Sequence, residues 1–176
     1  MPGLWKKICK CRAWLRVCCE LMYIKMKKQI IQVKNKKVKI ADIKALLQKC
    51  TDVSAAYLFG SGAQNLSVVN DLDILVLLNK KADKRTAYFD LIHQLAVHLD
   101  LPEDHIDLLF FDYFEADITV LTRAVNEGIL IKNDDPEYLS DMIDIFSRYL
   151  MENEAMMIRG LRLRQERLEE FSESRS

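Results

Sequence analysis

The chain lacks the features that would place it in a membrane or on a secretion route. Its 176 residues contain no run of 18 apolar residues, so the sequence predicts no transmembrane helix. The first 24 residues also lack the apolar core of a signal peptide, because Arg12, Arg16 and Glu20 interrupt it. No internal repeat or low-complexity linker is present. We therefore expect a cytoplasmic protein with one domain and an extension.

The cysteines lack the Cys-x-x-Cys spacing that is typical of zinc sites. Four of the five lie early in the chain: Cys9, Cys11, Cys18 and Cys19. Apolar and thiol side chains between Leu4 and Met22 recur at alternating steps of four and three, which is the spacing of one helix face. The pattern favours an amphipathic helix over residues 4–24 with buried thiols, and metal binding by the same thiols is the alternative.

The net charge is zero, but the two signs are unevenly distributed. Residues 1–49 hold 14 Lys and Arg against Glu20 and Asp42, a charge of +12, and the remainder is −12. Such asymmetry indicates a basic tail that meets nucleic acid, anionic lipid or an acidic partner, or that folds against its own acidic body. We predict a basic amphipathic extension over residues 1–28 and a single domain over 29–176. Met26-Lys27-Lys28 is typical of a bacterial or archaeal protein start, and residues 1–25 could be a tail or the product of an overlong gene assignment. If so, a chain that begins at Met26 should fold and keep nucleotide binding, because the core strands and the motif residues all follow it.

Hydrophobic periodicity predicts alternating strands and helices after the extension. Strands are expected at residues 54–59, 71–78, 105–111 and 129–131, and a lysine-rich alternation at 29–40 turns at Lys34-Asn35. Helices are expected at 40–49, 83–99, 117–127 and 136–170. The inward positions are Ile43, Leu46 and Leu47 in the first helix, and Phe89, Ile92, Leu95, Ala96 and Leu99 in the second. This order predicts an α/β sheet covered by helices.

The segment from Tyr57 to Leu78, YLFGSGAQNLSVVNDLDILVLL, carries the chemistry. Side chains alternate along a strand, so Asp71 and Asp73 project from one face at the start of a buried strand. Paired carboxylates there repel one another and resist burial, whereas a divalent cation such as Mg²⁺ would explain them. Gly60 permits backbone conformations that other residues avoid, and N–H groups at the start of the following helix attract phosphate.

These residues resemble the nucleotidyltransferase superfamily, and within it the minimal nucleotidyltransferase (MNT) branch. Gly60-Ser61 ends one strand, Asp71-x-Asp73 opens the next, and Asp107 in HIDLLFFD stands where a third carboxylate is expected. The resemblance covers residues 57–112 well and continues more loosely to about 157. The chain departs from the pattern with nine residues between Ser61 and Asp71 instead of ten, with Asn65 where a glycine is common, and with Asn70 in place of Ser.

The resemblance implies a nucleotidyltransferase palm, which is a small mixed sheet with helices packed on it, followed here by a long C-terminal helix. It implies that Gly60 and Ser61 bind the phosphates of ATP. Asp71, Asp73 and Asp107 would be the catalytic residues and would hold Mg²⁺, and Asp107 would accept the proton of the attacking hydroxyl. Two metal ions can stabilise the attacking and leaving oxygens in this type of displacement.

Three functions remain open at this point. Members without a nucleic-acid domain resemble antitoxins that transfer AMP to a tyrosine of a HEPN-domain ribonuclease toxin, and the segment Asn126–Leu130 followed by Tyr138, Phe146 and Tyr149 is similar to theirs. An antibiotic nucleotidyltransferase is the second candidate, although such enzymes usually need another domain. A module that neutralises its partner by contact alone is the third. The shorter loop and Asn65 favour it slightly, and the three intact aspartates oppose it.

The helix predicted from Pro136 carries more large apolar residues than one core-facing stripe requires. Ten lie between residues 142 and 158: Met142, Ile143, Ile145, Phe146, Tyr149, Leu150, Met151, Met156, Met157 and Ile158. Exposed apolar patches mark interaction sites, and methionine suits an adaptable one. We expect this helix to provide the toxin-binding surface or a surface for homo-oligomers.

Overall fold

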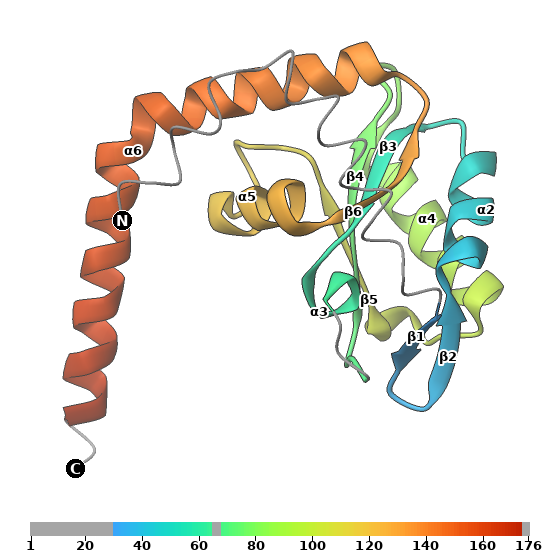
Figure 1. The fold of residues 1–176 in the computed structure, drawn as a ribbon, viewed down its shortest axis with the longest axis horizontal. Helices are drawn as coiled ribbons and strands as arrows, with labels where there is room; N and C mark the ends of the chain where they lie inside the picture. The colour runs from blue at the N-terminus through green and yellow to red at the C-terminus, as the bar shows by residue number, and fades with distance from the viewer. Residues whose placement is uncertain (1–29, 65–67, 174–176) are drawn as a thin grey trace. The chain divides into compact units, whose positions relative to one another are not determined.

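A computed structural model describes residues 30–64 and 68–173 (Figure 1). The predicted helix at 4–24, the extension 1–28 and Asn65 lie outside the described residues. The chain divides into two compact units, Met1–Leu139 and Ser140–Ser176. No helix among the described residues is long and apolar enough to cross a membrane.

The centre of the first unit is a four-stranded mixed sheet in the order β5-β4-β3-β6. Strand β3 (Val53–Leu58) pairs antiparallel with β4 (Leu72–Leu78) and with β6 (Ile129–Asn133). Strand β5 (Ile106–Phe110) runs parallel to β4, and α4 (Lys84–Leu99) together with the short 3-10 helix η2 (Glu103–His105) connects these two strands. The predicted edge strand at 129–131 is β6, two residues longer than expected. The α/β fold class with a small mixed sheet is therefore confirmed.

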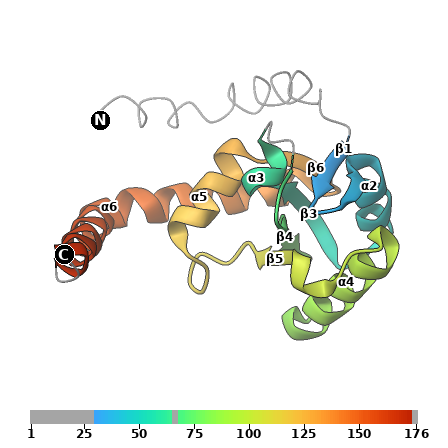
Figure 2. The same cartoon turned by 90° about the horizontal axis from the view of Figure 1, so that it is seen from below.

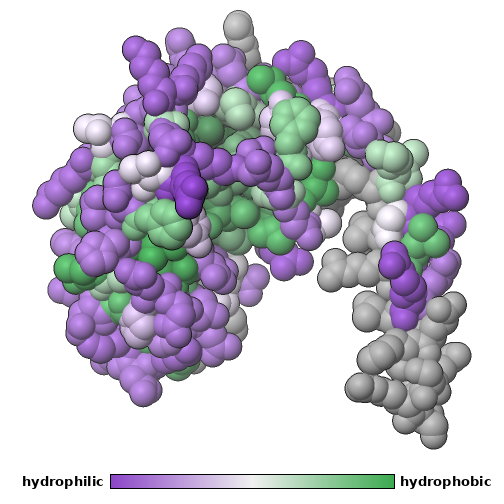
Figure 3. Space-filling view, turned by 180° about the vertical axis from the view of Figure 1, so that it is seen from behind, coloured by the Kyte–Doolittle hydropathy of each residue, from purple (hydrophilic) through white to green (hydrophobic). Residues whose placement is uncertain are grey.

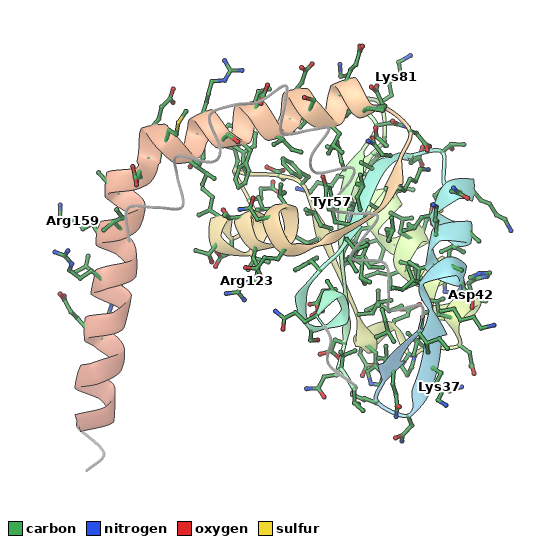
Figure 4. The ribbon with its side chains drawn as sticks, in the orientation of Figure 1. Lys37, Asp42, Tyr57, Lys81, Arg123 and Arg159 are labelled. Atoms are coloured by element: carbon green, nitrogen blue, oxygen red, sulfur yellow. The ribbon has the colours of Figure 1, made fainter. Side chains whose placement is uncertain are left out.

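Helices cover both faces of this sheet (Figure 2). One face packs against α2 (Ile40–Lys49) and α4, and alternate residues of the central strands point into that core, including Leu58, Leu72, Ile74 and Val76. The residues between them, such as Tyr57 and Leu75, lie on the other face, on the side of α5 (Ile118–Glu127) (Figure 4). Both faces are buried because both carry apolar side chains, so only polar residues at the strand ends remain available for chemistry.

The helices begin and end close to their predicted bounds. Helix α2 has the predicted range and buries Ile43, Leu46 and Leu47. Helix α4 begins after Asp83, whose carboxylate accepts the N–H of Thr86 at 2.8 Å and satisfies a donor of the first turn.

The prediction that Phe89 faces the core was wrong. Its side chain is 61 % exposed. The predicted inward residues Ile92, Leu95 and Ala96 are buried, and the core-facing stripe also includes Ala87 and Leu91. With 3.6 residues per turn, Phe89 lies about 110° from the middle of these five buried residues.

A hairpin precedes the sheet, formed by β1 (Ile30–Val33) and β2 (Lys36–Lys39). It turns at Lys34-Asn35 as predicted, and Lys34 adopts a left-handed conformation with φ of 48°. Its inward side chains Ile31, Val33 and Val38 belong to the same core as α2 and α4, while its lysines are exposed. The hairpin is therefore attached to the domain by apolar packing.

Lys132 is the buried cation of the described core. It lies on β6 and its side chain is 1 % exposed. The ammonium group donates to the carbonyls of Leu47 and Cys50 at 2.8 Å each, and lies 3.0 Å from the carboxylate of Asp134. It thus satisfies carbonyl groups at the C-terminal end of α2, where a helix leaves acceptors without internal partners.

Helix α6 (Pro136–Glu173) starts in the first unit and forms the described part of the second. Its first turn is capped by Asp135, whose carboxylate accepts the N–H of Tyr138 at 2.9 Å. Within the second unit Phe146 and Leu150 are buried, while Met151 and Ile158 are 51 % and 52 % exposed. The long C-terminal helix and the exposure of part of its apolar residues are confirmed.

We predict that Lys132→Met lowers the free energy of unfolding by about 2 kcal/mol, because buried carbonyls lose a charged donor while the apolar stem is kept. Lys37→Met is the matched control, since Lys37 is exposed on β2 and a surface change costs less than about 0.5 kcal/mol. Urea denaturation measures both variants. Equal stability of the two would contradict the capping role.

Candidate active site

The site begins where β3 ends. Phe59 donates its N–H to the carbonyl of Asp73 at 3.0 Å, so the two strands stay paired up to the turn. Gly60 then adopts φ of +61°, a region that side chains disfavour. A Cβ placed on Gly60 would lie 2.2 Å from the Asp73 carboxylate oxygen Oδ2. Glycine is therefore required both by the backbone conformation and by the position of the Asp73 side chain.

Parallel pairing brings two of the predicted carboxylates together. Asp73 on β4 and Asp107 on β5 are register partners, so their side chains leave the sheet side by side on the same face. That face is the one on the α5 side, since the neighbours Leu72 and Ile74 point into the opposite core. Asp71 lies two residues before Asp73, just ahead of the strand. The two strands predicted around the motif, residues 54–59 and 71–78, thus differ from β3 and β4 by at most one residue at each end.

The three carboxylates affect one another electrostatically. The pKa of Asp73 is raised from 3.8 to about 6, first by burial and then by the negative charges of Asp107 and Asp71. Burial and like charges both disfavour the ionised form, and nearby positive charge would reverse the effect. The position of Asp73 therefore costs stability at neutral pH and favours a bound cation.

The donor set fits Mg²⁺. Carboxylate oxygens are the hard ligands that this ion prefers, and it is usually held by one or two carboxylates together with waters and substrate phosphates. Among residues 30–64 and 68–173 no three His, Cys, Asp or Glu side chains form a group that could hold an ion unaided.

A pocket of about 320 Å³ lies beside these carboxylates. Its lining contains both Asp71 and Asp73 and also Ser61, so the structure brings the predicted phosphate-binding and metal-binding residues to one hollow. Val68, Val69 and Asn70 complete the lining. Asp107 does not line it and has an exposed side chain on the β5 side of Asp73.

Ser61 belongs to α3 (Gly60–Ala63), a single turn. The N–H groups of a first helical turn have no intrahelical partners and are available to an anion. Since four residues add up to only a small dipole, Ser61 and these individual N–H groups would provide the phosphate contacts. The predicted anion site would therefore rely on local hydrogen bonds.

A larger hollow of about 640 Å³ lies elsewhere on the first unit, and it contains none of the three carboxylates. It is lined by the N-terminal half of α4, by the end of β5 and by residues 112–116. At its rim the ammonium group of Lys84 contacts Asp112 at 2.9 Å, and this hydrogen bond lowers the pKa of Asp112. Asp112 is close in sequence to Asp107, but it pairs with Lys84 and lies in a different hollow from Asp71 and Asp73.

The sequence did not reveal that the hairpin reaches the site. Val69 accepts the N–H of Lys34 and donates its own N–H to Gln32, both at 2.8 Å. Backbone hydrogen bonds between residues more than 30 positions apart leave no mark in the sequence pattern.

Comparison with known proteins decides the family. The sequence model of the "Polymerase beta, Nucleotidyltransferase" family matches residues 41–137, more than half of the chain. The chain belongs to this nucleotidyltransferase family. The match includes Gly60, Ser61 and the three aspartates. No curated protein matches the chain.

Solved structures with a similar fold come from toxin–antitoxin complexes. A chain of a variant MntA–HpeT complex is 24% identical with a TM-score of 0.50, and the alignment covers 69% of this chain and 96% of that one. A toxin–antitoxin structure with AMP-PNP is 25% identical (TM-score 0.48, coverage 69% and 98%). A complex of a tri-AMPylated Shewanella oneidensis HEPN toxin with an MNT antitoxin is 24% identical (TM-score 0.47, coverage 69% and 95%).

We predict that Asp73→Asn stabilises the protein above pH 6 in the presence of a chelator. Because the pKa of Asp73 is raised to about 6 in the folded state, its stabilising contribution is present below its unfolded value and is lost as pH rises through 6. The gain over wild type at pH 7.5 should be on the order of 1–2 kcal/mol and should vanish near pH 4. Urea denaturation across this range measures it, with Asp90→Asn on the exposed side of α4 as control. A variant less stable than wild type at pH 7.5 would contradict the repulsion.

Proposed function

We propose that this nucleotidyltransferase is an antitoxin that transfers AMP from ATP to a hydroxyl group, a tyrosine by preference, of a partner HEPN ribonuclease toxin. The observation that carries the proposal is the register pairing of Asp73 with Asp107, next to a pocket that Ser61 and Asp71 line. Family membership supports nucleotidyl transfer as the reaction. The proposal that the acceptor is a hydroxyl group of a toxin rests on the segment from Asn126 to Tyr149 and on the similarity to antitoxins.

Each residue has a role that its position allows. Ser61 and the N–H groups of α3 would hold the β- and γ-phosphates of ATP. Asp71 and Asp73 would hold Mg²⁺ at the phosphates, and Asp107 would complete a second site. When bound, Mg²⁺ supplies positive charge that stabilises the attacking and leaving oxygens.

The acceptor would approach from the β5 side of Asp73. In an in-line displacement the attacking and leaving oxygens lie on opposite sides of the phosphorus. The pocket with Ser61 takes the departing pyrophosphate, so the hydroxyl comes from the side of Asp107, whose exposed carboxylate would accept its proton. The new bond joins the hydroxyl oxygen to the α-phosphorus, and the bond from that phosphorus to the pyrophosphate oxygen breaks.

A protein acceptor is favoured over an antibiotic. Residues 41–137 match the catalytic family, and among the described residues the β1–β2 hairpin and most of α6 lie outside this match. The segment from Asn126 to Tyr149 resembles antitoxins of this class, and the fold is similar to a chain from a toxin–antitoxin complex. Neutralisation of the toxin by contact alone is the second candidate, and the departures at Asn65 and Asn70 favour it.

The exposed apolar side chains of α6 are our candidate for the toxin-binding surface, and Met151 and Ile158, which are seven residues apart, lie on the same side of this helix. Large hydrophobic side chains are at least 38 % exposed at Ile145, Met151, Met156, Ile158 and Leu163. Figure 3 shows hydrophobic side chains among hydrophilic ones on the described surface. Arg159, labelled on α6 in Figure 4, is exposed and follows Ile158 in the sequence, so the surface is mixed in character. A second copy of this chain is the alternative partner for these side chains of α6.

We predict that Asp71→Asn combined with Asp73→Asn abolishes AMP transfer and leaves the protein folded, since two repelling charges are removed. Calorimetric titration should show Mg²⁺-dependent ATP binding by the wild type, and labelled ATP should mark the toxin. Asp112→Asn, at the other hollow, should transfer normally. Wild-type protein that binds no nucleotide with Mg²⁺ but still neutralises the toxin would leave only the contact mechanism.

We predict that Met151→Glu with Ile158→Glu weakens the toxin complex at least about tenfold, because charge is introduced into an apolar contact, and leaves ATP binding unchanged. A pull-down and a sizing column measure the complex. Arg159→Glu, at the neighbouring exposed position, controls for the change of charge. An unchanged complex would exclude this face, and loss of a homo-oligomer instead would assign the face to self-association.

A further inference from the structure

The β1–β2 hairpin lies outside the part of the chain that matches the family, residues 41–137, and yet it contacts the nucleotide pocket. The contact is made by main-chain hydrogen bonds to Val69. Lys34 donates to the Val69 carbonyl at 2.8 Å, Val69 donates to the Gln32 carbonyl at 2.8 Å, and Val33 and Val69 form a parallel bridge. Val69 lines the pocket, and so do Asn70 and Asp71, which follow it.

The hairpin also lies against the opposite wall. A Cβ placed on Gly62 of α3 would lie 3.8 Å from the Ile31 Cδ1 atom, so Ile31 packs beside the turn that carries Ser61. Gly62 and Ile31 are both buried. The Ile31 side of β1 therefore contacts α3, which carries Ser61, and the C-terminal end of β1 is bonded to Val69 in the segment that carries Asp71.

We propose that the β1–β2 hairpin is a positioning element for the nucleotide pocket and that Val69 is the residue through which it acts. The inference rests on the proposed function, which it deepens. Val69 is 3 % exposed and shares a hydrophobic core with Ile31 and Val33, so side chain and main chain are both fixed. Catalytic and binding groups act only when their positions are fixed with respect to the substrate. If the fold orders them before the substrate binds, binding does not have to offset the loss of conformational entropy.

Lys34 offers a sharp way to break the contact. Its φ of 48° and its N–H are both needed for the bond to Val69. Proline has no N–H and holds φ near −65°, so Lys34→Pro removes the bond and the turn conformation together. Glycine keeps the N–H and adopts positive φ freely, so Lys34→Gly removes only the side chain, which contacts His105 at 2.5 Å.

A second pair of variants separates positioning from stability. Val69→Ala and Val53→Ala each remove two methyl groups from the same core, and both side chains are at most 3 % exposed. Val53 lies at the start of β3, five residues from its end at Leu58 and away from the pocket lining. Lys37, on β2, the strand without the bridge to Val69, is labelled in Figure 4 and serves as a site for a silent change such as Lys37→Gln.

The experiment titrates the full-length variants with ATP and Mg²⁺, and follows amide hydrogen exchange of residues 68–73 without nucleotide. Lys34→Pro and Val69→Ala should bind ATP about tenfold more weakly, which is ~1.4 kcal/mol, and residues 68–73 should exchange faster. Lys34→Gly, Lys37→Gln and Val53→Ala should behave as wild type in both measurements, although Val53→Ala loses unfolding free energy comparable to Val69→Ala.

Unchanged exchange and unchanged binding in Val69→Ala and Lys34→Pro would overturn the proposal, and so would an equal loss of binding in Val53→Ala. If Lys34→Pro fails to fold, Val69→Ala alone decides. Wild-type protein that binds no ATP would refute the proposed function. In that case the hydrogen exchange of residues 68–73, which is measured without nucleotide, still decides whether the hairpin orders this segment.

Discussion

The register of β4 between its two neighbours is the constraint on which the rest of the site depends. Leu72, Ile74 and Val76 are fully buried on one face of the sheet, so a slip by one residue would turn Asp73 into that core. With the register held, Asp73 lies beside Asp107 on the opposite face and over Gly60. The apolar side chains of the strand thus determine where its carboxylate stands.

The candidate site lies where the surrounding structure disfavours the ionised form of a carboxylate. Asp73 is partly buried and has two acidic neighbours, and its raised pKa reflects both conditions. Active sites commonly hold groups whose ionisation the surroundings disfavour, because a bound substrate or ion then gains by relieving the conflict. Elsewhere in the domain, buried charge is satisfied internally, as at Lys132 with its two carbonyls and Asp134. This contrast distinguishes the carboxylate cluster from structural charge.

Much of the fold could be predicted because its patterns are local. The range of α2 and its inward residues follow from the spacing of Ile43, Leu46 and Leu47, and the Asp-x-Asp alternation places both carboxylates on one side of a strand. Helix α4 shows the limit of this reasoning. Its existence, its start near Asp83 and the inward position of Leu95 were predictable from the sequence, but packing against the sheet buried Leu91 and left Phe89 exposed.

By itself, the sequence determined the types and order of the elements, the chemistry of the motif and the length of the last helix, since these depend on residues within a few positions of one another. Only the tertiary structure decided that Gly60 lies against the Asp73 carboxylate, that Lys132 caps α2, and that the hairpin bonds to Val69. These contacts join residues 13 to 85 positions apart, through main-chain atoms or the far end of a side chain. No periodicity encodes them, because every residue has a backbone N–H or carbonyl that could serve, and the folded chain selects which ones meet.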